Sequence, residues 1–236
     1  MQDAPGRHVT RPLVPSVGLG VLHLFCRVGP STDAEAVVHA VKATRAAGDQ
    51  VVTAALLGHK ADVAVMALGP DLWRIRALQS TLRLAGLEAV SSYVSLTELS
   101  EYAEGIPEEM KQARLYPKLP PEGKPAFCFY PMSKRRLGAD NWYSLDFDER
   151  KALMLGHGNV GREYRGRIVQ LITGSTGLDD YEWGVTLFGT HPDDLKECVY
   201  QMRFDETSAR FAEFGPFWAG MVSEIEDVLD SVLSGS

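Results

Sequence analysis

The stretches VAVMALGPDLWRIRALQ (63–79) and VTLFGTHPDDLKECVYQ (185–201) decide the fold expected for this chain, because they repeat one pattern. Each runs from a short apolar strand through glycine and Pro-Asp into a helix that has a leucine in its first turn. One shared segment is a weak repeat, but it favours two fused copies of a single folding unit.

The residues around the first copy complete a recognisable unit. Short apolar runs bounded by glycine or proline predict strands, and longer stretches with apolar residues at helical spacing predict helices. The predicted strands cover 17–28, 51–58, 62–69 and 88–100, and the predicted helices cover 31–49 and 71–86. This βαββαβ order is that of the ferredoxin-like unit.

The same order returns in the second half. Its predicted strands cover 125–132, 168–176, 182–190 and 214–222, and its predicted helical stretches cover 144–166, loosened by glycines, and 192–214. We therefore expect an α+β fold of two ferredoxin-like halves whose sheets pack against each other, as in a dimeric α/β-barrel.

The predicted organisation has four parts. The proline-rich start is expected to be a flexible arm, and the proline- and charge-rich middle segment is expected to be a linker. The expected parts are a flexible arm at 1–16, the first half at 17–104, the linker at 105–125 and the second half at 126–236.

Composition restricts the function. A net charge of −7 argues against a nucleic-acid binder, which needs a basic patch or stripe. Cys26, Cys128 and Cys198 form no Cys-x-x-Cys pair, so neither a zinc site nor a redox dithiol is supported, and unpaired thiols suit a reducing compartment. No segment has the apolar length of a signal peptide or a membrane helix, so a cytoplasmic protein is expected.

Two places in the second half could carry chemistry. His157 lies between Gly156 and Gly158, which is compatible either with a core histidine or with an imidazole that a flat ligand such as haem approaches. Tyr130 ends an apolar strand shortly before the basic run 134–136. That run is either a solvated turn or an anion-binding mouth with a phenol at its rim.

Several motifs occur together in this half. They are YPMSKRR (130–136), NWY (141–143), RKALMLGHG (150–158), GRIVQLITGSTGLDDYEWGVTLF (166–188) and MRFDETSARFAEFGPF (202–217). In combination they resemble the coproheme decarboxylases of the chlorite dismutase superfamily, most of all their actinobacterial branch. The resemblance implies two ferredoxin-like halves, a porphyrin in the second half and a ring of five subunits.

The resemblance also implies roles for particular residues. His157 matches the proximal iron ligand, Tyr130 the redox-active tyrosine, and Lys134 a residue that holds a propionate. The remaining matches lie at positions that line the pocket or contact a propionate: Met132, Trp142, Trp183 and Ser208. Gln170 stands where true chlorite dismutases are expected to place an arginine, and this disfavours chlorite chemistry.

The implied substrate is iron coproporphyrin III, and the implied product is haem b. Hydrogen peroxide would be the oxidant, a Tyr130 radical would attack two propionates in turn, and contact with ferrochelatase is a further expectation. The segment before the Tyr130 strand lacks the distal histidine described for actinobacterial relatives, which leaves Arg114, Tyr116, Lys118 or water as candidates. The alternatives are a chlorite dismutase or peroxidase on the same fold, and a haem carrier without turnover.

Overall fold

The first ferredoxin-like half is present as predicted. The computed structural model describes residues 11–103 and 105–234. The elements of this half are β1 (Gly20–Arg27), α1 (Ala34–Ala46), β2 (Gln50–Leu56), β3 (Val63–Gly69), α2 (Leu72–Leu84) and β4 (Glu88–Thr97). Asp33 and Asp71 cap the two helices by accepting a backbone N–H, which satisfies donors that no helical carbonyl reaches.

The second half repeats this order. Its elements are β5 (Ala126–Lys134), α4 (Phe147–Arg162), β8 (Ile168–Gly174), β9 (Trp183–Gly189), α5 (Pro192–Met202) and β11 (Trp218–Val222). A small hairpin of β6 (Arg136–Leu137) and β7 (Asp140–Asn141), followed by a 3-10 turn at Trp142–Ser144, is inserted between β5 and α4. The predicted α+β fold with two ferredoxin-like halves is therefore confirmed.

Strand pairing shows how the halves join. Both halves have the ferredoxin order, β4-β1-β3-β2 in the first and β11-β5-β9-β8 in the second. The outer strands then pair across the halves, β11 with β2 and β4 with β8, so the nine-stranded sheet closes into a barrel. The segments 63–79 and 185–201 occupy equivalent places, as β3–α2 and β9–α5.

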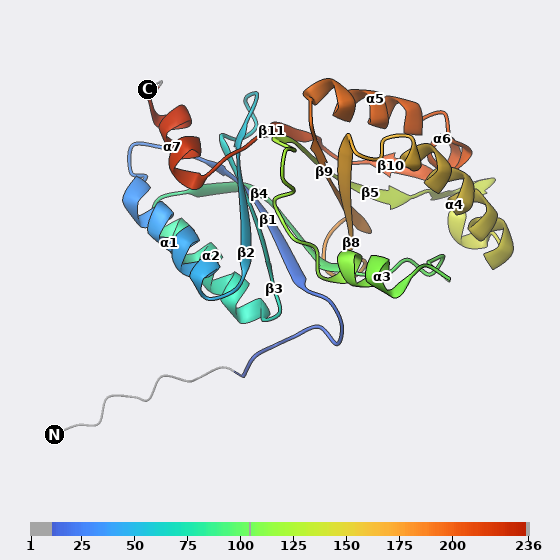
Figure 1. Ribbon diagram of the computed structural model, residues 1–236, viewed down its shortest axis with the longest axis horizontal. Coiled ribbons are helices and arrows are strands. Elements are labelled where there is room, and N and C mark those ends of the chain that lie inside the picture. The colour runs from blue at the N-terminus through green and yellow to red at the C-terminus, as the bar shows by residue number, and fades with distance from the viewer. Residues whose placement is uncertain (1–10, 104, 235–236) are drawn as a thin grey trace.

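The core lies in layers on either side of this sheet. Inside the barrel, aromatic rings from both halves pack together, among them Phe25, Phe129 and Trp218. Outside it, α1 and α2 cover the strands of the first half, while a smaller cluster lies under α5 in the second half. Figure 1 shows the two helical groups on opposite sides of the barrel.

The predicted helix at 192–214 is wrong as a single element. The chain leaves α5 at Met202, and Asp205 takes an extended backbone conformation and accepts the Ser208 N–H. A new helix, α6 (Glu206–Phe211), and a short strand, β10 (Ala212–Phe214), follow. The aspartate therefore starts a second helix where the apolar spacing suggested continuity.

Two helices were not predicted. The segment at 105–125, expected to be a linker, contains α3 (Glu108–Leu115). Near the C-terminus, α7 (Ile225–Leu233) buries Ile225, Val228 and Leu229 in the core of the first half. In Figure 1, α7 lies beside α1, far from the other helices of the second half. The C-terminal segment therefore completes the helical layer of the N-terminal half.

The predicted arm falls partly outside the described residues. Residues 1–10 are not among those described. In the part that is described, the Leu72 N–H donates to the Leu13 carbonyl, and the Leu13 N–H donates to the Asp71 carboxylate. Leu13 therefore contacts the start of α2.

Candidate functional site

The outer face of β5, β9 and β8 forms the floor of the candidate site. Strand register places its side chains in three rows, since directly paired residues point to the same side of a sheet. The rows are Met132–Trp183–Gly174, Tyr130–Val185–Ile172 and Cys128–Leu187–Gln170. The floor is therefore largely apolar, with the Tyr130 phenol in the middle row and the Gln170 amide in the third.

Helix α4 lies over this side of the molecule without joining the core. None of its sixteen residues is buried, and its main neighbours are α6 and α5. Arg150, Met154 and His157 are half-buried and recur at i, i+4 and i+7, so they share one face. A Cβ atom at Gly156 or Gly158 would meet no heavy atom within 4 Å, so the glycines leave room beside the imidazole.

His157 is held in one tautomer by a carboxylate. Its Nδ1 lies 2.7 Å from Oδ2 of Asp205, which is almost fully buried. A carboxylate accepts hydrogen bonds, so Nδ1 carries the proton and Nε2 of the neutral ring keeps its lone pair. Burial raises the pKa of Asp205, but the hydrogen bonds from His157 and Ser208 outweigh it and hold that pKa below its usual value. The arrangement is that of a histidine prepared to bind a metal through Nε2.

Lys134 is a buried cation at the end of β5. It is 8% exposed, and its ammonium lies 4.3 Å from the centre of the Trp142 ring. Burial lowers its pKa to about 8, while the charges of Asp205 and Glu182 act in the opposite direction. No hydrogen bond from this ammonium to another described residue is present. Of the three basic residues predicted to form a mouth, Lys134 is thus the buried one, and a negatively charged group would stabilise it.

Tyr130 projects from the same face of β5. Its ring stacks on Phe217 at 4.5 Å and meets Phe214 edge to face at 5.6 Å. Its hydroxyl makes no hydrogen bond with the described part of the chain. Burial raises its pKa, with Cys128 and Cys198 adding to the shift and Arg203 opposing it, so the phenol is neutral. Oxidation of this phenol therefore requires loss of a proton as well as an electron.

The other predicted residues fall into two groups. Ser208 lies in the first turn of α6 and donates its N–H to Asp205, and Trp142 lies beside the Lys134 ammonium and in T-shaped contact with Phe211, so these join His157 and Lys134 in one cluster. Met132 and Trp183 are paired across β5 and β9 at the next row of the floor. Gln170 lies two rows further along β8 and is exposed.

The three candidates for a distal base are on the surface. Arg114 and Lys118 are exposed. Tyr116 is 45% exposed, and its hydroxyl accepts the Gly18 N–H at 3.1 Å. Their roles stay predictions.

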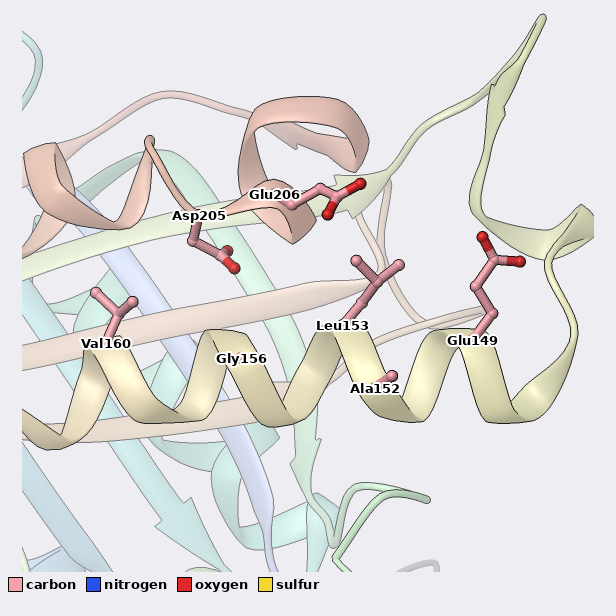
Figure 2. Close-up of a pocket in the computed structure, with 7 residues that line it drawn as sticks. All are labelled: Glu149, Ala152, Leu153, Gly156, Val160, Asp205 and Glu206. Atoms are coloured by element: carbon pink, nitrogen blue, oxygen red, sulfur yellow. The ribbon is translucent and has the colours of Figure 1, made fainter.

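A cavity of about 510 Å³ lies between α4 and the start of α6. Figure 2 shows Leu153 and Val160 of α4 on one side of it and Asp205 and Glu206 on the other. With Glu149, three carboxylates line this space, which disfavours a polyanionic ligand. Tyr130 and Lys134 are not among the residues that line this cavity.

A profile of the chlorite dismutase family matches residues 31–223. The chain belongs to the chlorite dismutase family.

Two relatives and two solved structures place this chlorite dismutase-family chain more closely. It is 47% identical over 177 residues to a coproheme decarboxylase of Staphylococcus carnosus, covering 71% of this chain and 70% of that protein. It is 48% identical over 186 residues, 72% of its length, to a proposed haem-binding protein of Natronomonas pharaonis. The chain spans about 30% of that second relative's length.

Among solved structures, a haem-binding protein from Thermus thermophilus matches with a TM-score of 0.81 at 35% identity, covering 95% of this chain and all of that one. A variant of the chlorite dismutase from Candidatus Nitrospira defluvii matches with a TM-score of 0.73 at 20% identity, covering 92% and 96%. At that identity the second match shows the fold alone. In the described residues, no helix of this family member is long and apolar enough to cross a membrane.

Three carboxylates that bind residues of the site in this family member were not predicted from the sequence. Asp205 orients His157, Glu182 binds the Lys134 backbone, and Glu98 accepts the indole N–H of Trp183 at 3.0 Å. Asp205 had one signal, its position three residues before Ser208 at a helix start. Glu98 comes from the first half, so no local pattern connects it to Trp183.

Proposed function

We propose that this chain is a coproheme decarboxylase, which converts two propionates of iron coproporphyrin III to vinyl groups with hydrogen peroxide and so forms haem b. The observation that carries the proposal is the placement of Tyr130 and Lys134 on one face of β5, both buried. They are four residues apart, or about 13 Å along the strand. A ligand that engages both must be large and carry an anionic group, as a porphyrin with propionates does.

The residues present fit an iron porphyrin. In the described part of the chain, no group of three or more His, Cys, Asp or Glu could hold a metal ion. An iron held by a porphyrin would need no such cluster, and His157 would hold it through Nε2. The Asp205 hydrogen bond fixes the ring and increases its basicity. When bound, the iron porphyrin supplies the oxidising equivalents that it takes from peroxide.

Tyr130 is the residue that reacts with the substrate. It gives up an electron and its phenolic proton, and the resulting radical takes a hydrogen atom from the β-carbon of the adjacent propionate. Loss of CO2 and of one more electron leaves the vinyl group. Each propionate therefore consumes one peroxide and one proton and yields CO2 and two waters, and two cycles complete the reaction.

Lys134 orients the propionate. Its side chain is 8% exposed, and its ammonium has only the Trp142 ring as a close partner among the described residues, so a carboxylate gains a strong ion pair there. Holding the carboxylate fixes the β-carbon relative to the phenol, which lowers the entropic part of the barrier. Ser208 and Trp183 are proposed to contact a propionate and the porphyrin edge.

Gln170 supports this chemistry over chlorite conversion. A neutral amide on the floor provides no cation for an oxyanion such as chlorite. The relative from Staphylococcus carnosus, a coproheme decarboxylase, points the same way. From the resemblance we also propose that the protein forms a homopentamer, lies in the cytoplasm and contacts ferrochelatase. Light scattering of the purified protein measures the number of subunits.

The decisive experiment loads the purified protein with iron coproporphyrin III, titrates hydrogen peroxide and follows the mass of the pigment. Two successive losses, each equal to CO2 plus two hydrogens, ending at haem b, are expected. Binding followed only by bleaching would mean a haem-binding or peroxidase-like protein instead. Oxygen release from chlorite in a parallel assay would point to a chlorite dismutase.

A further inference from the structure

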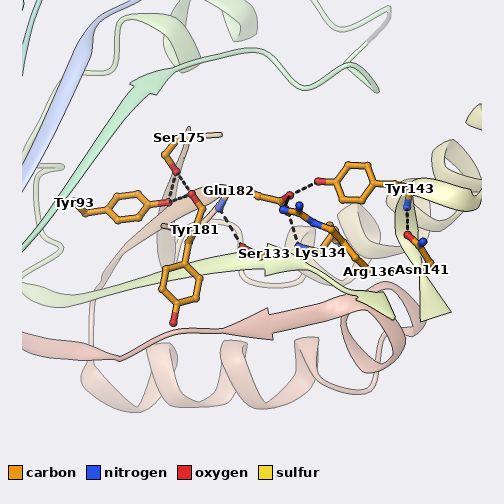
Figure 3. A network of polar contacts seen from close by, with 9 residues as sticks. All are labelled: Tyr93, Ser133, Lys134, Arg136, Asn141, Tyr143, Ser175, Tyr181 and Glu182. Atoms are coloured by element: carbon orange, nitrogen blue, oxygen red, sulfur yellow. Dashed lines mark hydrogen bonds and ion pairs between the residues drawn. The ribbon is translucent and has the colours of Figure 1, made fainter. Parts of the chain in front are cut away.

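Glu182 lies where three segments meet beside the proposed site. Its side chain is 5% exposed. Oε2 accepts the backbone N–H of Lys134 at 2.7 Å, and Oε1 accepts both Nη2 of Arg136 and the hydroxyl of Tyr143 at 2.6 Å. Figure 3 shows these contacts converging on one carboxylate. It therefore connects the end of β5, the β6–β7 hairpin and the 3-10 turn.

The same carboxylate fixes what surrounds the Lys134 ammonium. Tyr143 directly follows Trp142, whose ring the ammonium faces at 4.3 Å. Asn141 caps the same turn by accepting the Tyr143 N–H at 3.1 Å. The Tyr143 hydroxyl thus holds the Trp142 turn against Glu182, while the backbone bond holds Lys134 itself. Both the lysine and its aromatic platform depend on one buried side chain.

The backbone of Glu182 adds to this connection. Its N–H lies 3.1 Å from the Met132 carbonyl and 3.2 Å from the Ser133 hydroxyl, and its carbonyl accepts the Ser175 N–H at 2.8 Å. Ser175 in turn contacts Tyr93 inside the barrel. Glu182 is therefore attached to the rigid part of the molecule and can transmit that rigidity to Lys134.

We infer that Glu182 is a positioning residue for the substrate-binding lysine, because it holds the strand end and the aromatic platform between which the Lys134 ammonium lies. This inference rests on the proposed function in giving Lys134 a propionate to bind. It assigns to Glu182 a role through Lys134 and no contact with the substrate.

The negative charge of Glu182 also affects the pKa of Lys134. Burial lowers the pKa of Lys134 to about 8, and the negative charges of Asp205 and Glu182 keep it from falling further. The ammonium is lost as the pH rises through this folded pKa, and propionate binding is lost with it. Removing the charge of Glu182 therefore moves the loss to lower pH.

Other charged groups of the surrounding elements are paired. Asp205 is shared with His157 of α4, Arg136 of the hairpin is paired with Glu182, and Arg135 lies 3.6 Å from Glu213 of β10. Glu213 pairs with Ser133 in the β10–β5 ladder, so it is close in the fold but belongs to the Arg135 pair. Its side chain is 49% exposed, and it offers a nearby carboxylate that does not bind Lys134 for comparison.

The first measurement uses the ligand-free protein, so that it does not depend on turnover. Lysine side chains are labelled with 13C, the Lys134 signal is assigned with Lys134→Arg, and its titration is followed by NMR. In Glu182→Gln the midpoint should fall by about one pH unit, whereas Glu213→Gln should leave it unchanged. An unchanged midpoint in folded Glu182→Gln would overturn the inference.

The second measurement separates geometry from charge. Tyr143→Phe removes one donor to Glu182 and keeps the carboxylate charge. It should weaken iron coproporphyrin III binding by several-fold while the Lys134 midpoint stays in place. If Glu182→Gln does not fold, Tyr143→Phe still tests the positioning role of Glu182. Unchanged affinity for iron coproporphyrin III in Tyr143→Phe would overturn that role.

The two proposals can fail separately. A wild-type protein that fails to decarboxylate coproheme, together with a lowered midpoint in Glu182→Gln, removes the function and keeps the link between Glu182 and Lys134. Decarboxylation by the wild type with no change of midpoint keeps the function and removes the positioning role.

Discussion

Helices α1 and α4 occupy the same place in the two ferredoxin-like halves, between the first and second strands, yet they are used differently. Helix α1 buries Val37, Ala40 and Val41 in the core. Helix α4 buries none of its residues. One architecture can therefore use a helix for core stability in one copy and leave the equivalent helix outside the core in the other.

The sequences of the two helices agree with this difference. Helix α4 contains Gly156, Gly158 and Gly161, and each glycine in a helix interior costs about 1 kcal/mol relative to alanine. Part of that cost is offset at the ends, where Asp146 accepts the Glu149 N–H and Arg162 lies in the last turn. A helix assembled in this way is held by its caps and by α5 and α6.

The largest expected effect is the loss of decarboxylation when a residue of the strands next to these helices is changed. Tyr130 of β5 corresponds to Leu24 of β1. Each lies four residues after the residue that pairs with the glycine ending the neighbouring strand, β9 in one half and β3 in the other. Tyr130→Phe should retain coproheme binding and reduce decarboxylation to background, because phenylalanine has no phenolic hydrogen to lose. Pigment mass after peroxide addition is the measurement.

Leu24→Ala is the matched change in the first half. It should lower the free energy of unfolding by about 2–5 kcal/mol and leave the chemistry intact in the protein that stays folded. Decarboxylation by Tyr130→Phe would contradict the division of roles.

The next effect concerns the imidazole on α4. His157→Ala should weaken iron coproporphyrin III binding by roughly 100-fold or more, because even residues behind a metal ligand typically contribute 10–100-fold. Absorbance titration gives the affinity. Unchanged affinity would remove His157 as the axial ligand, and a control at His39 of α1, on the other side of the barrel, should have no effect.

Stability should separate the two helices directly. Val41→Ala in α1 removes a fully buried side chain and should cost about 2 kcal/mol. Leu155→Ala in α4 changes a side chain that is 55% exposed and should stay within about 0.5 kcal/mol. Urea unfolding of both variants measures this, and equal losses would show that α4 belongs to the core after all.

The smallest expected effect concerns the stability of α4 and tests why it contains glycines. Gly158→Ala should stabilise the ligand-free protein by about 0.5–1 kcal/mol, since alanine is the better helix former and its Cβ meets nothing within 4 Å. If the glycine exists to let a porphyrin approach, the same variant should bind coproheme less tightly. Higher stability with unchanged affinity would separate the glycine from the ligand.

Most strands and helices could be predicted because apolar periodicity reports local geometry. The spacing in 192–214 continues through Asp205, so the break between α5 and α6 could not be predicted without knowing that this carboxylate caps a helix and faces His157. Helix α7 had a readable apolar stripe at Ile225, Val228 and Leu229, but periodicity does not say which half a helix joins.

Some residues of the candidate site could be predicted from the sequence, and others could not. Tyr130, Lys134 and His157 were found through motifs that resemble a family, and their proposed roles still await the experiments above. Glu182 is one of 31 acidic residues, and only the fold distinguishes it from the solvated ones. Long-range pairing of this kind leaves no mark in local sequence.

The position of β11 has a consequence for synthesis of the protein. This strand is inserted between β5 and β2, and α7 follows it onto the first half. While the ribosome is still translating residues before 218, β2 therefore has an open edge and the first half lacks part of its helical cover. Such an intermediate exposes the surfaces that chaperones recognise, so the nascent chain is expected to be more prone to aggregation before β11 and α7 emerge than after they do.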